Sequence, residues 1–199
     1  MKQLENLLAK RNKKTGNVNV FNLQSYDTCP GKTSYCEKTC YAHKGNYCFN
    51  VVINKYARNL SATLRPDFIQ RICNELALSK SKIVRVHSSG DFYSLDYLAK
   101  WIKIAGYCKD NVFYAYTRCW HLNEYKKLLN QFEALPNVVL WKSIDPSDKV
   151  LPSGRLAFIE GSKGACKPNC QAQLKDNVTC DTCRICFSKA AKKVCFKKH

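Results

Sequence analysis

The sequence predicts an α/β protein whose largely parallel sheet forms either an open sheet or a partial (βα) barrel, followed by a cysteine-rich C-terminal metal-binding tail. Short apolar runs alternate with longer amphipathic segments, which is typical of a parallel sheet with helical crossovers. From Gly161 the composition shifts to Cys, Lys, Asn and Gly with little periodicity. A chain of 199 residues is long enough to bury a sizeable core. We therefore expect an α/β domain at 1–160 and a tail at 161–199 that packs on it and is ordered by metal.

The first predicted strand covers residues 18–23, where apolar and polar residues largely alternate. Two helices follow it, at 48–64 and from Pro66 to about Leu76, because proline ends the first helix and suits the first turn of the second. The remaining elements alternate regularly along the chain: strand 83–87, helix 95–107, strand 112–116, helix 122–135, strand 138–141 and strand 155–159. Five strands are too few to close an eight-stranded barrel.

The chain is strongly basic, with 33 Lys and Arg against 15 Asp and Glu and a formal charge of +18. Such a charge attracts phosphate backbones or acidic partners, so nucleic acid is a candidate partner. No DNA-binding motif organises the lysines, however, so the favoured alternative is that they form only a solubilising surface. We expect no membrane partner, because no apolar run reaches the roughly 18 residues of a membrane span. We also expect no signal peptide at the N-terminus. A cytoplasmic protein with reduced thiols is therefore expected, which favours metal ligation over disulfides.

Three cysteines, Cys29, Cys36 and Cys40, follow the first predicted strand on one loop. Three thiolates can hold three irons of a [4Fe–4S] cubane and leave the fourth iron open for a small molecule. Full protein ligation would require a fourth residue, for which His43 is a candidate; the alternative is an ordinary surface histidine. Radical S-adenosylmethionine enzymes also place a three-cysteine loop after the first strand of a partial barrel. This region resembles that arrangement, although its Cys-x6-Cys-x3-Cys spacing differs from their Cys-x3-Cys-x2-Cys.

A second set of cysteines lies in the tail: Cys170, Cys180, Cys183 and Cys186. Two successive x2 spacings bring three sulfurs onto one tight loop, and one upstream cysteine completes the ligation of a four-iron cluster, as in bacterial ferredoxins. A structural zinc site held by four cysteines is the alternative. Cys166 and Cys195 lie outside this set.

Polar residues follow three predicted strands at their carboxyl ends, where ligands collect in open parallel sheets. They are expected to share a rim with the first cysteine set and to form a cofactor pocket. The alternative is structural: residues 89–91 form a turn, Arg118 pairs with Asp91 or Asp145, and His87 is a satisfied core histidine. The candidate cofactor-binding residues are His87, Ser89, Gly90, Asp91, Tyr116, Arg118 and Lys142.

Several motifs taken together closely resemble a bacteriophage family called gene product eighty-eight. They are Cys29-Pro-Gly…Cys36…Cys40-Tyr-Ala, Tyr56-Ala-Arg58-Asn59, Arg85-Val-His87-Ser-Ser-Gly90-Asp91-Phe92-Tyr93, Phe113-Tyr-Ala-Tyr116-Thr117-Arg118 and Val178-Thr-Cys180-x2-Cys183-x2-Cys186. The likeness runs from about Gly16 to Phe187. It implies a viral or prophage origin, hence the host cytoplasm, and it supports Cys170 over Cys166 as the remote member of the tail set. The family carries over no activity, and its resemblance to radical S-adenosylmethionine proteins is distant.

The preferred hypothesis is a viral redox enzyme resembling the radical S-adenosylmethionine class, with one or two [4Fe–4S] clusters. Ser89, Gly90 and Asp91 would help to seat the amino or ribose groups of S-adenosylmethionine, and the tail cluster would relay electrons or stabilise the fold. Its partners would be a redox protein or a small-molecule substrate. The alternative is a non-catalytic iron–sulfur electron carrier, or a basic module that binds nucleic acid or a host protein and has a structural cluster or zinc.

Overall fold

A computed structural model describes residues 5–198. The strands described there form one sheet whose spatial order follows the chain from β1 to β7. β1 is antiparallel to β2, and every other neighbouring pair is parallel. The expected largely parallel α/β sheet is thus confirmed, and it is open, with β1 and β7 as its edges. The strands are β1 (Ala9–Asn12), β2 (Gly16–Phe21), β3 (Ile83–Val86), β4 (Val112–Thr117), β5 (Val138–Ile144), β6 (Leu156–Ile159) and β7 (Lys193–Phe196).

The four long helices lie where the apolar periodicity predicts them, apart from shifts of a few residues at their ends. The largest shift is at α5, because residues 119–125 form two short 3-10 turns before that helix begins. None of the helices within residues 5–198 is long and apolar enough to cross a membrane. The helices are α1 (Ser34–Thr39), α2 (Asn50–Thr63), α3 (Phe68–Ala77), α4 (Leu95–Tyr107), α5 (Lys126–Ala134), α6 (Gln171–Leu174) and α7 (Cys180–Cys183).

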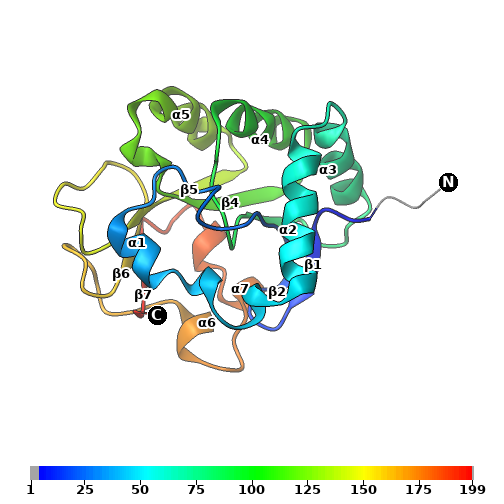
Figure 1. Cartoon of the computed structure of the whole chain (residues 1–199). Helices are drawn as coiled ribbons and strands as arrows, with labels where there is room; N and C mark the ends of the chain where they lie inside the picture. The colour runs from blue at the N-terminus through cyan, green and yellow to red at the C-terminus, as the bar shows by residue number, and fades with distance from the viewer. Residues whose placement is uncertain (1–4, 199) are drawn as a thin grey trace.

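The sheet is buried on both faces. Helices α3, α4 and α5 lie along one face, as Figure 1 shows, because they belong to the successive right-handed crossovers from β2 to β5, which fall on the same side of the sheet. Phe113 and Leu140 pack toward these helices. The residues that alternate with them, Tyr114 and Val139, pack instead on the opposite face, together with Val20 of β2. That opposite face, which we call the tail face, is where the cysteines gather.

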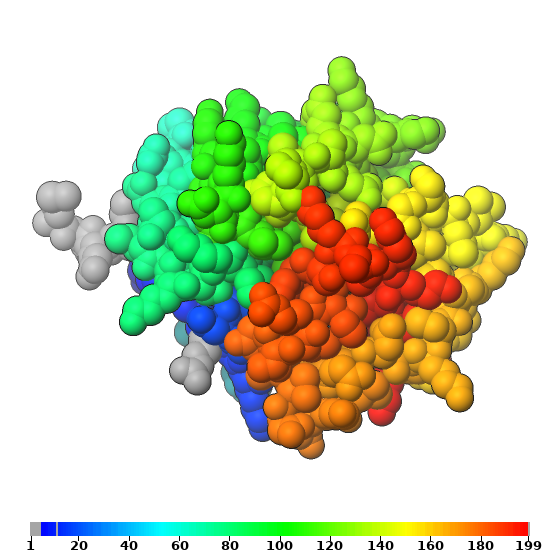
Figure 2. Space-filling model, turned by 180° about the vertical axis from the view of Figure 1, so that it is seen from behind, coloured from blue at the N-terminus to red at the C-terminus, as the bar shows by residue number. Residues whose placement is uncertain are grey.

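The tail crosses this face and joins the sheet. Its last strand, β7, pairs with β6 in parallel. Near α7, the backbone amides of Cys180 and Asp181 donate to the carbonyls of Lys14 and Thr15 at distances of 3.0 and 3.3 Å. In Figure 2 the tail, orange to red, accordingly lies against the blue N-terminal segment. Part of the order of the tail therefore comes from the sheet itself.

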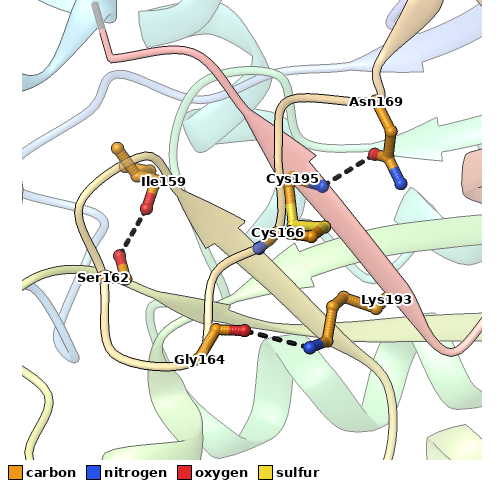
Figure 3. The surroundings of a disulfide bond; sticks show 7 residues. All are labelled: Ile159, Ser162, Gly164, Cys166, Asn169, Lys193 and Cys195. Carbon is orange, nitrogen blue, oxygen red and sulfur yellow. Dashed lines mark hydrogen bonds between the residues drawn. A yellow bond between two sulfur atoms is a disulfide. The ribbon is translucent and has the colours of Figure 1, made fainter.

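A disulfide joins Cys166 to Cys195, so the expectation that all the thiols are reduced is wrong for this pair. The cysteines are 29 residues apart, but the pairing of β7 with β6 brings their Cα atoms to 5.8 Å. Figure 3 shows the loop that leads to Cys166 tied to β7, where Lys193 donates to the Gly164 carbonyl at 2.9 Å. The side chain of Asn169 accepts from the Cys195 amide at 2.9 Å. This disulfide leaves Cys170 free for the tail set.

Candidate functional site

The two cysteine sets face one cavity of about 580 Å³ on the tail face of the sheet. The spacing of the cysteines gives no indication of this meeting, because the sets are more than a hundred residues apart in the chain. Of the seven cysteines predicted as metal ligands, only Cys183 does not line the cavity. The lining cysteines are Cys29, Cys36 and Cys40 from the loop after β2, and Cys170, Cys180 and Cys186 from the tail.

The first cysteine loop is fixed against the carboxyl ends of β4 and β5. Gly31 packs so closely on the chain after β4 that a Cβ atom there would lie 2.3 Å from the Arg118 carbonyl oxygen. Thr33 caps α1 by accepting from the Cys36 amide at 3.1 Å, and its hydroxyl donates to Asp145 at 2.5 Å. These contacts explain the glycine and threonine between the first two cysteines.

The segment after β3 holds the start of the same loop. The Ser89 carbonyl accepts from the Leu23 amide, and the Asp91 amide donates to the Thr28 carbonyl, both at 3.0 Å. Gly90 has a φ of +85°, and a Cβ atom there would lie 2.7 Å from the Cβ of Leu23, so glycine is required for both reasons. The expected turn is therefore present, and it also contributes Ser89, Gly90 and Asp91 to the cavity lining.

Asn22 connects this turn to α2, a role that the strand pattern did not predict. Its side-chain oxygen accepts from the Ser88 and Ser89 amides at 2.7 and 3.2 Å. Its own side-chain amide donates to Tyr56 at 3.1 Å, and its carbonyl accepts from Asn59 at 2.9 Å. The Tyr56-Ala-Arg58-Asn59 motif could have indicated this role, because Tyr56 and Asn59 hold the chain that leads to Cys29.

Arg118 is committed to two carboxylates. Its guanidinium lies 3.1 Å from Asp145 and 3.0 Å from Asp148. Burial disfavours the Asp145 carboxylate, but hydrogen bonds from Ser147 and Thr33 and the charge of Arg118 together lower its pKa below the usual value. Arg118 therefore forms the ion pair with Asp145 that the structural alternative predicted, and it also lines the cavity.

Asp91 is likewise satisfied within the protein. Its carboxylate accepts from the Phe92 and Arg118 amides at 2.7 and 2.8 Å, and thereby joins the ends of β3 and β4. Burial raises the pKa of Asp91 despite these bonds. The carboxylate therefore supports the cavity wall.

The imidazole of His87 packs among core aromatic rings. Its Nε2 atom lies 2.8 Å from the Tyr97 hydroxyl, and Phe21 and Phe92 pack edge-on against it. Burial, with a further contribution from the Arg85 charge, lowers the pKa of His87 to about 3. The ring is therefore neutral at physiological pH, but its Nδ1 atom is buried without a hydrogen-bond partner among the described residues, so the expected core histidine is only partly satisfied.

Lys142 and His43 do not line the cavity. β5 extends through Lys142, whose ammonium donates to the Ser153 carbonyl at 2.6 Å and lies 3.7 Å from Glu133 of α5. The His43 side chain is exposed and packs edge-on against Tyr26. Of the seven candidate cofactor residues, all but Lys142 therefore line the cavity.

Arg85 of β3 is a site residue that the sequence analysis did not select. It pairs with Val20 of β2 and Tyr114 of β4, so it belongs to the row of side chains on the tail face. Its guanidinium lies 5.3 Å from the centre of the Tyr116 ring, and its Nε donates to the His87 carbonyl at 3.1 Å. No carboxylate of the described residues forms an ion pair with it. The sequence feature that could have indicated this role is a charged residue between the two valines of a buried strand.

The charge of Arg85 acts on the tail thiols. Burial raises the pKa of Cys180, while Arg85 opposes that shift; burial also raises the pKa of Cys186 to about 12. The negative charges of Cys170, Cys180 and Cys183 further raise the pKa values of neighbouring tail thiols. These mutual effects show that the thiols lie near one another and near a fixed positive charge.

The pKa values of thiols in the first set are raised in the same way. Burial raises the pKa of Cys29 to about 12 and that of Cys36 to about 11, and the neighbouring Cys40 contributes to both shifts. Both sets therefore consist of buried or half-buried thiols, and neighbouring thiols in each set repel one another once ionised. Such thiols gain most when a cation binds them as thiolates.

The spacing of the thiols bears on which metal group the cavity could hold. Among residues 5–198 no three Cys, His, Asp or Glu side chains are grouped closely enough to hold a metal ion, so the metal prediction is not confirmed. In a cubane, however, each cysteine binds a different iron, so its thiolates stand further apart than the ligands of a single ion. Among residues 5–198 no side chain forms a hydrogen bond of normal geometry with the buried hydroxyl of Tyr114, but this hydroxyl lies close enough to Cys180 to lower the pKa of that thiol. Cys180 and Cys186 in turn add to the effect of burial in raising the pKa of Tyr114. A cluster thiolate at Cys180 would accept the proton of this hydroxyl, so the residues present fit the group.

Comparisons with known proteins give a family. A family model described as Gene product 88 matches residues 2–166, and so ends before the tail cysteines. The "Gene 88 protein" of Mycobacterium phage D29 is 28% identical over 135 residues, which is 61% of this chain and 53% of that protein. The "Gene 88 protein" of Mycobacterium phage L5 is 28% identical over 132 residues, which is 61% of this chain and 54% of that protein. The matched regions thus span about half the length of these relatives.

No solved structure matches the chain. The family model covers most of the chain, and the expected link to bacteriophage proteins is confirmed by it and by both relatives. The chain therefore belongs to the Gene product 88 family.

Proposed function

We propose that the protein is an iron–sulfur redox protein in which two cysteine sets serve one cavity. The observation that carries this proposal is the meeting of Cys29, Cys36 and Cys40 with Cys170, Cys180 and Cys186 around about 580 Å³ of space. Six cysteines brought from opposite ends of the chain to one cavity are hard to explain as core packing. Thiolate-rich sites of this kind are typical of iron–sulfur clusters.

The residues beneath the tail set suit an anionic cluster. A four-iron cluster bound by four thiolates carries net negative charge, and Arg85 is a cation that lines the cavity and forms no ion pair with a carboxylate of residues 5–198. The Tyr114 hydroxyl, which lies beside Cys180, can donate its proton to a tail thiolate. A nearby positive charge and hydrogen bonds to sulfur both stabilise the reduced state of such clusters.

The first set supports an enzyme that resembles the radical S-adenosylmethionine class. Three cysteines leave a fourth position, and the acidic side chains near them, Asp91 and Asp145, already accept hydrogen bonds from the protein. An open iron there would face the cavity, beside Ser89 and Gly90. A reduced cluster supplies one electron to a small molecule bound at such a site. The cavity residues would hold that molecule and keep it near both cysteine sets.

The tail set would pass electrons to the cavity. Cys183, its fourth member, is half-buried and does not line the cavity, so it offers a side of the cluster nearer to the surface. That same feature favours a second candidate function, a simple electron carrier in which both clusters are fully ligated. The two candidates differ in whether a small molecule reaches iron at the first set.

The test is anaerobic reconstitution with iron and sulfide, followed by electron paramagnetic resonance of the reduced protein with and without S-adenosylmethionine. Serine replacement at Cys29, Cys36 and Cys40 together should remove one signal and leave the tail signal. We expect S-adenosylmethionine to change only the signal that this triple variant loses. Cys48→Ser is the matched control, because Cys48 is exposed and belongs to neither set.

The outcomes separate the candidates. A spectrum that does not respond to S-adenosylmethionine would exclude the enzyme and leave the electron carrier. Purified protein that contains zinc, and that takes up no iron on reconstitution, would exclude both.

A further inference from the structure

Two thiols outside the cavity are in contact. Cys73 lies on α3 and Cys108 caps the end of α4, and their Sγ atoms are 3.3 Å apart. Neither residue lines the cavity. We propose that Cys73 and Cys108 form a dithiol–disulfide site, separate from the cavity cysteines, whose oxidants are peroxides or small-molecule disulfides.

The contact is built by the backbone on both sides. Cys73 is held by α3, whose neighbouring Ile72 and nearby Leu76 are fully buried against the core. On the other side, the Cys108 amide donates to the Ile104 carbonyl at 2.9 Å. The side chain of Asn137 donates to the Cys108 carbonyl at 3.3 Å. Two independently anchored segments therefore present their thiols to each other.

Little movement is needed to join the two sulfurs. A disulfide bond is about 2.0 Å long, so the Sγ atoms must approach by about 1.3 Å, which small side-chain rotations can supply. Both side chains are half-buried, so small oxidants can reach them. The hydrogen bond between the thiols also lowers the pKa of Cys73, which makes it the better nucleophile of the two.

The reaction with oxidised glutathione balances as a two-electron exchange. The Cys73 thiolate attacks one sulfur of the glutathione disulfide and releases one glutathione thiolate. Cys108 then loses its proton and attacks Cys73, which breaks the mixed disulfide and releases the second glutathione. The protein loses two electrons and two protons, and the glutathione disulfide is reduced to two thiols.

The new bond would close a loop between residues 35 apart and tie α3 to α4. Such a cross-link restricts the unfolded chain, and for a protein of this size we expect the melting temperature to rise by roughly 5–15 °C. The cavity and its cysteines would not take part, so iron loading should not depend on this pair.

The experiment treats the full-length protein with oxidised glutathione, alkylates the remaining thiols and maps disulfides by mass spectrometry of peptides prepared without reduction. We expect a peptide that links Cys73 to Cys108, together with the rise in melting temperature. Cys73→Ser and Cys108→Ser should each abolish both results, and Cys48→Ser should keep both. If serine prevents folding, Cys73→Ala and Cys108→Ala replace these variants.

Three results would overturn the proposal: both cysteines alkylated after oxidation of the wild type, a disulfide formed with a cavity cysteine instead, or a rise in melting temperature that survives in Cys73→Ser. Iron uptake is measured on the same variants. Uptake as in the wild type supports a separate site, whereas a loss of iron in Cys73→Ser and Cys108→Ser would refute the separation. The disulfide map and the melting temperature do not depend on the proposed iron–sulfur function, so their failure is distinguishable from a failure of that proposal.

Discussion

Replacing Arg118 with methionine tests the buried ion-pair network that supports the first cysteine loop. Methionine keeps much of the apolar stem and removes the guanidinium, which lies 3.1 Å from Asp145 and 3.0 Å from Asp148. The three side chains are 8%, 1% and 2% exposed, so Asp145 would remain buried without a cation and Asp148 would keep only His121, 3.0 Å away. Breaking a buried pair from one side typically costs about 3–5 kcal/mol, and we expect Arg118→Met to lower the free energy of unfolding by that amount.

Urea denaturation of the protein without bound metal, at pH 7.5 and in both wild type and variant, measures this loss. Arg65→Met is the matched control, because Arg65 pairs with Asp67 at the surface, where the side chains are 59% and 38% exposed. The control should change the free energy of unfolding by at most about 0.5 kcal/mol. If Arg118→Met costs no more than Arg65→Met, the network does not hold the loop as argued.

Three further predictions concern single residues of the site. His87→Asn should make the protein less sensitive to acid. Because the folded pKa of His87 is about 3, this residue contributes stability that is present above its unfolded pKa and is lost as the pH falls. The expected loss in the wild type is about 2 kcal/mol of unfolding free energy between pH 7.5 and 5. Asparagine tolerates the positive φ of that position and does not titrate, so equal acid lability in urea titrations would contradict this assignment. Gly31→Ala should lose iron from the first set on reconstitution, because its Cβ would lie 2.3 Å from the Arg118 carbonyl, whereas Gly106→Ala, with nothing within 4 Å, should load normally. Arg85→Gln should make the reduction potential of the tail cluster more negative in a spectroelectrochemical titration, and an unchanged potential would remove Arg85 from that role.

Much of the sheet follows from local sequence pattern. The strands from β2 to β6 combine apolar and β-branched residues, and each is followed by a turn or an amphipathic helix. β1 and β7 escaped prediction because their sequences, Ala-Lys-Arg-Asn and Lys-Val-Cys-Phe, lack a clear apolar pattern. As edge strands they are defined by the partner strand beside them, which local sequence does not specify.

The site was only partly predictable, for a related reason. Cysteine spacing within each set is local and can be read from the sequence, and so can the rule that loops at strand ends share a rim. The meeting of the sets depends on how the tail crosses the sheet, which involves contacts over more than a hundred residues. The direction of Lys142 depends on β5 extending to Ile144, and the role of Arg85 depends on which face of β3 it occupies. These properties follow from register and tertiary packing, which the pattern of one strand does not fix.

The most direct test of the shared metal cavity is a crystal structure of the anaerobically reconstituted protein, with anomalous scattering recorded at the iron absorption edge. We expect two iron peaks bordering the same cavity, one bound by Cys29, Cys36 and Cys40 and the other by Cys170, Cys180, Cys183 and Cys186. A zinc ion at either set, no iron at all, or two clusters that open onto different faces of the sheet would contradict the account.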